Sequence, residues 1–283
     1  MSPLQPFSIE QLGACLQRLG LPAAAPVPAD RANLDRLIAA ALQHLPFENL
    51  DVLLERPVDI HPDAVFAKVV ERRRGGYCFE LNSLFARLLV SLGYDVRLLV
   101  GRVRWGVVPE VPLTQQSHLL LRVELPEGPH LVDVGFGGAN PPRALPLRLE
   151  EDLGDGWRLL PGPREGEIEL GLDARSGRLV LYRFTLLEQE WLDYEPRNWF
   201  TATHPQSVFR RFLKVAISDG DSRLTLNDGV FVQRGRDGEA QQTRIDGADA
   251  LLALLRERFR LSLPPASGEA LRERLVRLLA ASA

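Results

Sequence analysis

The chain has 283 residues, of which 45% are hydrophobic and 25% charged; these values are typical of a globular protein and exclude a disordered or fibrous one. The formal charge of −3 lacks the basic excess of a general nucleic-acid binder, and two cysteines are too few for a disulfide framework. Because residues 1–11 do not resemble a secretory signal and no apolar run approaches the roughly 18 residues that span a bilayer, we expect a cytoplasmic protein with neither a nucleic-acid nor a membrane partner.

The first ninety residues carry the signals of helices. Ser8 and Asp30 are placed to cap two helices with apolar stripes. Pro62 begins a third, and residues 81–92 have apolar side chains at helical spacing. We therefore predict a helical N-terminal region.

After Gly93 the apolar pattern changes to short runs rich in Val and Leu, separated by turn signals. The predicted strands are residues 95–105, 117–125, 130–134, 157–160, 168–170, 179–187, 213–217, 224–226 and 230–232. Two further helices are predicted at 247–259 and 268–280. Helices followed by antiparallel strands and a mixed tail favour a segregated α+β fold.

Cys78 lies in the segment Arg-Arg-Gly-Gly-Tyr-Cys-Phe-Glu-Leu-Asn at residues 73–82. The two glycines indicate a sharp, exposed turn just before a helix, so the sulfur is expected at a helix N-terminus. There the helix dipole and the free N–H groups favour the nucleophilic thiolate. Cys15, inside a helix, fits the commoner role of a small buried hydrophobe, which Cys78 fits poorly.

A nucleophilic cysteine needs a base, and His118 at the start of a predicted strand is the candidate. A strand histidine taken alone is more often structural. Asp133 lies at the end of the apolar strand predicted at residues 130–134, where a buried carboxylate needs a partner. If the turn at 126–129 makes these strands a hairpin, Asp133 can orient the imidazole, and the residues favour a Cys78–His118–Asp133 triad.

Three further segments add to this pattern. Glu48 can pair with Arg74 and fix the turn, or it belongs to an unrelated loop after a helix. The glycine-rich residues 135–138 allow close approach of a ligand and could offer N–H groups to an anion, although no βαβ nucleotide signature surrounds them. Residues 198–209 form a polar and aromatic loop, whose Phe209 can equally be part of the core.

In order and spacing these segments resemble the arylamine N-acetyltransferases. The Arg-Gly-Gly-aromatic-Cys-Phe-Glu segment is the most specific, with Tyr77 at a position where Phe is also common. The matching segments are residues 46–50, 74–82, 118–121, 131–137 and 198–209. The rest of the chain, 141–189 and 219–283, matches only in general character.

The resemblance implies three domains with a papain-like arrangement of Cys, His and Asp. These are a helical bundle at 1–93, an antiparallel β-barrel-like domain at 94–203 and an α/β lid at 204–283. It also implies ping-pong transfer from acetyl-CoA, a co-substrate, to an aromatic amine or hydrazine through an acetyl-cysteine. The implied catalytic residues are Cys78, His118 and Asp133; family positions that line the acceptor pocket are Phe47, Phe136 and Phe209; and those near CoA are Gly135, Gly137 and Gly138.

Other readings share the same residues. A Cys-triad hydrolase or an amide-forming acyltransferase of secondary metabolism would use the same triad, and a non-catalytic binding module is disfavoured because all three members are present. No metal is expected, since the two cysteines and five histidines are scattered. The acceptor, xenobiotic or not, and the acyl chain (acetyl, propionyl or malonyl) are not fixed by the sequence, and a homo-oligomer is compatible with it.

Overall fold

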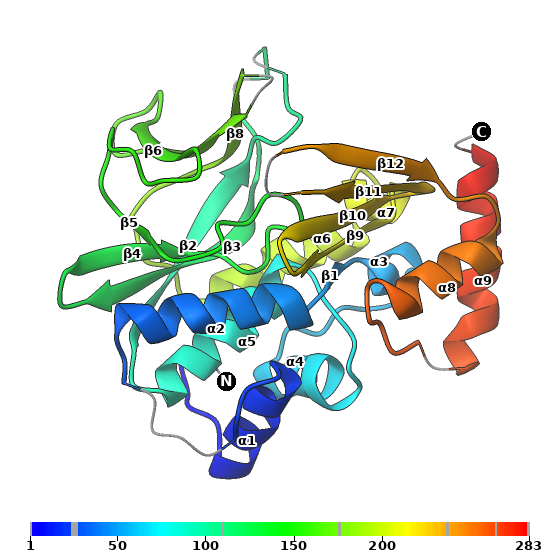
Figure 1. Cartoon of the computed structure of the whole chain (residues 1–283), viewed down its shortest axis with the longest axis horizontal. Helices are drawn as coiled ribbons and strands as arrows, with labels where there is room; N and C mark the ends of the chain where they lie inside the picture. Colours follow the sequence, from blue (N-terminus) through cyan, green and yellow to red (C-terminus); the bar gives the residue numbers. More distant parts are fainter. Residues whose placement is uncertain are drawn as a thin grey trace.

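The computed structural model describes residues 2–23, 28–108, 110–111, 113–174, 177–235, 238–263 and 265–281. Helices come first, antiparallel strands follow, and a mixed region completes the chain (Figure 1). The strands form one sheet of seven and one of five. The predicted α+β class is therefore confirmed.

The N-terminal helices begin where the sequence predicted. Ser8 caps α1 (Ile9–Arg18) by accepting a hydrogen bond from the N–H of Gln11, and the Asp30 side chain caps α2 (Arg31–His44) in the same way. The third predicted helix is divided between an α-helical and a π-helical turn. The remaining elements of this region are α3 (Leu50–Leu53), α4 (Pro62–Phe66), the π-helical η1 (Ala67–Glu71) and α5 (Cys78–Ser91).

A curled sheet of seven strands lies beside these helices, with the order β5-β4-β3-β2-β8-β7-β6. Its strands are β2 (Asp95–Val103), β3 (Gln116–Leu125), β4 (Gly128–Val132), β5 (Leu145–Pro146), β6 (Trp157–Pro161), β7 (Ile168–Ala174) and β8 (Gly177–Phe184). The side chains of β3 alternate between two cores: Leu119 and Leu121 join the helices, whereas Leu120 joins the core inside the curl. Helix α5 packs against β2 and β3, which brings its N-terminus to this sheet.

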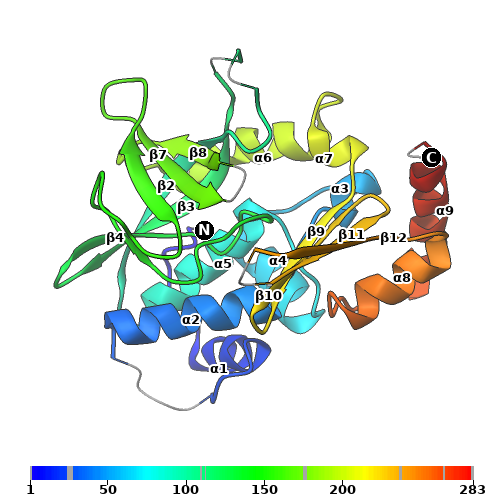
Figure 2. The ribbon, with the colours of Figure 1, turned by 45° about the horizontal axis from the view of Figure 1, so that its top comes forward.

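The second sheet has the order β1-β9-β10-β11-β12. Its strands are β1 (Phe47–Glu48), β9 (Lys214–Asp219), β10 (Ser222–Asn227), β11 (Val230–Arg234) and β12 (Ala240–Arg244), and α8 (Ala248–Glu257) and α9 (Pro265–Ala281) pack beside it. Between the sheets in sequence lie η2 (Trp191–Asp193), α6 (Tyr194–Thr203) and α7 (Val208–Arg211). Figure 2 shows α6 and α7 running from the curled sheet towards α3.

Strand β1 was not predicted, because two residues carry no strand periodicity. It comes from the region predicted to be helical, yet Phe47 and Glu48 pair with Ala216 and Val215 of β9. The N-terminal region thus supplies an edge strand to the C-terminal sheet. The division at residues 93 and 203 stays a prediction. Within the described part of the chain, no helix combines the length and apolar character needed to cross a membrane.

Candidate active site

Cys78 is the first residue of α5, as predicted from its position after two glycines. The turn is not exposed, however, because only 4% of Cys78 is accessible. The glycines are needed for close packing: a Cβ on Gly75 would lie 2.1 Å from the Pro46 carbonyl oxygen, and one on Gly76 would lie 2.7 Å from Glu80 Oε2. The expectation of an exposed turn was therefore wrong, and its cause is the segment at Pro46 that covers it.

The structure brings the three predicted catalytic residues together. Strands β3 and β4 form the predicted antiparallel hairpin, and His118 Nε2 lies 2.7 Å from Asp133 Oδ2. The Cys78 side chain lies close enough to the imidazole to raise its pKa, and because Nε2 is engaged by Asp133, Nδ1 is the ring nitrogen left to face the sulfur. The thiol itself donates to the Ser117 carbonyl oxygen at 3.6 Å.

The imidazole is held in its charged form. Burial alone would lower the pKa of His118, but the charge of Asp133, its hydrogen bond and the neighbouring Cys78 sulfur outweigh burial and raise the pKa to about 10. His118 and Asp133 are each 2% exposed, so little water screens this attraction. An imidazolium is the kind of cation that lies beside the sulfur of nucleophilic cysteines.

Asn82 fixes the carboxylate of the triad. Its Nδ2 donates to Asp133 Oδ1 at 2.9 Å and to the Leu119 carbonyl at 2.6 Å, while its Oδ1 accepts from the N–H of Val134 at 2.9 Å. Sequence reasoning assigned Asn82 no role. The signal was its position four residues after Cys78, which places both side chains on one face of α5.

Aromatic rings enclose the imidazole. The centroid of the His118 ring lies 5.3 Å from that of Phe136 and 4.9 Å from that of Tyr182. Burial, and after it the charge of Asp133, raise the pKa of Tyr182 well above its usual value. Its hydroxyl finds no hydrogen-bond partner of normal geometry among the described residues. Sequence reasoning missed Tyr182, since nothing local distinguishes a tyrosine of β8.

Two of the three predicted pocket phenylalanines lie near each other. The rings of Phe47 and Phe209 are 6.0 Å apart, and Gly137, with φ of +74°, is packed so that a Cβ would meet the Phe47 ring at 2.5 Å. A Cβ on Gly135 would lie 2.9 Å from the Cys78 Cα. The close approaches in the structure are between these residues and other atoms of the protein. Their contacts with a ligand therefore remain predictions.

The N–H groups of the glycine stretch are partly committed. The N–H of Gly135 donates to Asp133 Oδ1 at 2.9 Å and so helps to hold the triad. Nearby, a pocket of about 220 Å³ opens between the start of β3 and α6, with Ser117 and Thr201 on its walls. Because the Ser117 carbonyl contacts the Cys78 sulfur, this pocket adjoins the nucleophile.

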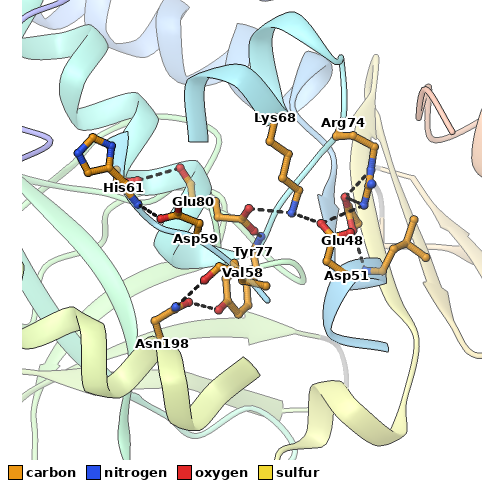
Figure 3. Close-up of polar contacts among 12 residues, drawn as sticks. Glu48, Asp51, Val58, Asp59, His61, Lys68, Arg74, Tyr77, Glu80 and Asn198 are labelled. Carbon is orange, nitrogen blue, oxygen red and sulfur yellow. Dashed lines mark hydrogen bonds and ion pairs between the residues drawn. The ribbon is translucent and has the colours of Figure 1, made fainter. Parts of the chain in front are cut away.

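The predicted pairing of Glu48 with Arg74 is confirmed, with 2.7 Å between Glu48 Oε1 and Arg74 Nη2. Both side chains are buried below the turn that carries Cys78 and belong to the larger network drawn in Figure 3. Within the described ranges, no group of three or more His, Cys, Asp or Glu side chains is arranged to hold a metal ion.

Comparison with known proteins agrees with this geometry. The family model described as "N-acetyltransferase" matches residues 30–267. Arylamine N-acetyltransferase of Mycolicibacterium smegmatis is 38% identical over 277 residues, covering 95% of this chain and 98% of the relative. A crystal structure of the M. smegmatis arylamine N-acetyltransferase superposes with a TM-score of 0.89 at 35% identity, covering 95% of this chain and 98% of that one. The Mycobacterium marinum arylamine N-acetyltransferase in complex with CoA gives a TM-score of 0.87 at 33% identity, covering 94% and 99%.

Proposed function

This chain belongs to the arylamine N-acetyltransferase family, and we propose that it transfers an acetyl group from acetyl-CoA to the nitrogen of an aromatic amine or hydrazine through an acetyl-Cys78 intermediate. The observation that carries the proposal is the buried grouping of Cys78, His118 and Asp133, in which His118 Nε2 lies 2.7 Å from Asp133 Oδ2 and Cys78 lies near enough to shift the pKa of His118. The CoA bound to the M. marinum relative supports a CoA thioester as the donor.

In the first half-reaction the Cys78 thiolate attacks the thioester carbonyl and forms a new carbon–sulfur bond. The tetrahedral oxyanion collapses, the bond to the CoA sulfur breaks, and the His118 imidazolium gives its proton to the departing CoA thiolate. The products are CoA as a free thiol, acetyl-Cys78 and neutral His118. Free backbone N–H groups at the start of α5 are the proposed donors to this oxyanion.

In the second half-reaction the amine nitrogen attacks the acetyl-Cys78 carbonyl and its proton passes to neutral His118. Cys78 leaves as a thiolate, which restores the imidazolium pair. In this proposal Phe47, Phe136 and Phe209 line the acceptor site, where their rings exclude water and accept a flat ring. Phe47 lies beside Phe209, and Phe136 lies beside His118. Anilines are neutral at pH 7 and therefore nucleophilic, whereas alkylamines are mostly protonated, which favours aromatic acceptors.

Mass spectrometry of the intact protein after incubation with acetyl-CoA tests the first half-reaction. One acetyl group is expected, and peptide mapping should place it on Cys78. The Cys78→Ala variant should gain none at that position and should not acetylate an aniline. An aniline acetylated at the wild-type rate by Cys78→Ala would refute the proposal.

The fate of the intermediate distinguishes transfer from hydrolysis. Acetyl-Cys78 made with labelled acetyl-CoA should persist in the absence of amine and disappear when an arylamine or hydrazine is added. Rapid loss of the label to water would instead indicate a hydrolase. Repeating the labelling with propionyl-CoA and malonyl-CoA determines the acyl preference.

A further inference from the structure

A buried ion pair outside the triad is connected to the residue that precedes Cys78. Lys68 Nζ is 2.7 Å from Glu80 Oε1, and the other carboxylate oxygen, Glu80 Oε2, accepts the N–H of Tyr77 at 3.0 Å (Figure 3). Tyr77 immediately precedes Cys78 and is the N-cap of α5. One carboxylate thus connects a lysine of η1 to the peptide that positions the thiol.

The side chains of this pair have little access to water. Glu80 is 1% exposed and Lys68 9%. Gly76 leaves the space that the carboxylate fills, since a Cβ there would lie 2.7 Å from Glu80 Oε2. A π-helical turn, a rare element that is often found at functional sites, carries Lys68. A buried carboxylate without a partner would be unfavourable, so this lysine is needed to keep Glu80 charged.

The other charged groups near this pair bond to one another or to Lys68, so the charge of Glu80 depends on Lys68. Asp51 Oδ2 also lies 2.7 Å from Lys68 Nζ, and Arg74 is bonded to Glu48 and lies 3.4 Å from Asp51. Burial raises the pKa of Glu80 despite Lys68, with Glu48 adding to the rise. The Tyr77 hydroxyl, which donates to Asn198, stays neutral because burial raises its pKa.

We propose that Lys68 is a positioning residue for acyl transfer: it keeps Glu80 ionised and directed at the N–H of Tyr77, which fixes the first turn of α5 and holds Cys78 against His118. The role of Lys68 in catalysis rests on the proposed function. Its effect on the sulfur can nevertheless be measured without any acyl donor.

The test is the rate at which iodoacetamide alkylates native Cys78 between pH 6 and pH 9. In Lys68→Met, Glu80 loses its cation, so its pKa rises further, its ionised fraction falls, and the charge-assisted hydrogen bond to Tyr77 weakens. We expect alkylation about tenfold slower than in wild type at pH 6.5, with the deficit shrinking as rising pH ionises Glu80 again. The double variant Lys68→Met/Glu80→Gln has no uncompensated carboxylate at position 80, and Asp51 keeps Arg74 at 3.4 Å. It should therefore recover most of the loss, with no added pH dependence.

The chain offers a matched control in Lys214, its only other lysine, which lies on β9 and bonds Asn227. Lys214→Met should leave the alkylation profile unchanged. The inference is overturned if the Lys68→Met profile runs parallel to wild type, or if the double variant is as slow as Lys68→Met; a purely structural lysine would change the melting temperature alone.

A second pair of variants serves if Lys68→Met does not fold. Glu80→Gln keeps an acceptor for the Tyr77 N–H, whereas Glu80→Leu removes it at similar volume. Alkylation should be slower in Glu80→Leu by about fivefold or more. Equal rates in the two variants would overturn the inference, while normal alkylation without acetyl transfer in wild type would count against the proposed function alone.

Discussion

Asn82 offers a direct test of how the triad is held, through the substitution Asn82→Ala. The side chain is fully buried and links α5 to β3 and to the residues that directly follow β4. Its removal leaves the Leu119 carbonyl and the Val134 N–H without this partner, and takes one of the two donors from Asp133 Oδ1.

The expected loss follows from these three groups. Two neutral backbone groups at about 1 kcal/mol each and one hydrogen bond to a carboxylate at about 1.5 to 3 kcal/mol sum to about 3 to 5 kcal/mol of unfolding free energy. Such a loss is a large part of the about 5 to 15 kcal/mol by which native proteins are normally stable, so urea unfolding must first show that the variant is folded. Because Asp133 is then less firmly oriented, alkylation of Cys78 at pH 7 should also slow by about tenfold.

Asn49 provides the matched control. It is also buried and also makes three hydrogen bonds, but all three go to backbone groups, those of Phe209, Phe212 and Lys214, and none to the triad. Asn49→Ala should therefore lose a similar unfolding free energy while Cys78 stays reactive.

The assay is iodoacetamide alkylation of the native protein, with urea unfolding measured in parallel. It reports Cys78 alone, because burial raises the pKa of Cys15 to about 12 and that residue is 1% exposed. If Asn82→Ala and Asn49→Ala alkylate at the same rate, Asn82 does not position Asp133 and the reasoning fails.

Three further outcomes are expected. Folding raises the pKa of His118 from about 6.5 to about 10. The stability difference between wild type and His118→Gln should therefore be largest below pH 6.5 and decline as the pH rises through 10. Urea unfolding at pH 6, 8 and 10 measures this difference, and a constant value would contradict the expectation. Gly75→Ala should lose about 3 kcal/mol or more of unfolding free energy, because its Cβ would lie 2.1 Å from the Pro46 oxygen. The control Gly268→Ala, in open space on α9, should not be destabilised. Similar melting temperatures for the two variants would refute the steric argument. Tyr182→Phe removes a buried hydroxyl that lacks a normal hydrogen bond. The unfolding free energy of this variant should be unchanged or up to about 1 kcal/mol higher than that of wild type. A loss of more than about 1 kcal/mol in a denaturant titration would show that the hydroxyl does have a stabilising partner.

The sequence by itself determined the local structure and pointed to Cys78 as the candidate nucleophile. Caps at Ser8 and Asp30 act within one helical turn, so their effect can be read without knowing the fold. The glycines before Cys78 and the short turn between the strands of His118 and Asp133 are equally local. These signals sufficed for an α+β fold and a candidate triad.

Only the tertiary structure decided which distant groups support that triad. Asn82 meets Asp133 across 51 residues, Lys68 meets Glu80 across a turn, and β1 joins β9 from more than 160 residues away. Such contacts depend on how α5, the curled sheet and the second sheet pack, and periodicity carries no information about that packing. The burial of Cys78 has the same origin, since the covering segment at Pro46 is remote in sequence and close only after folding.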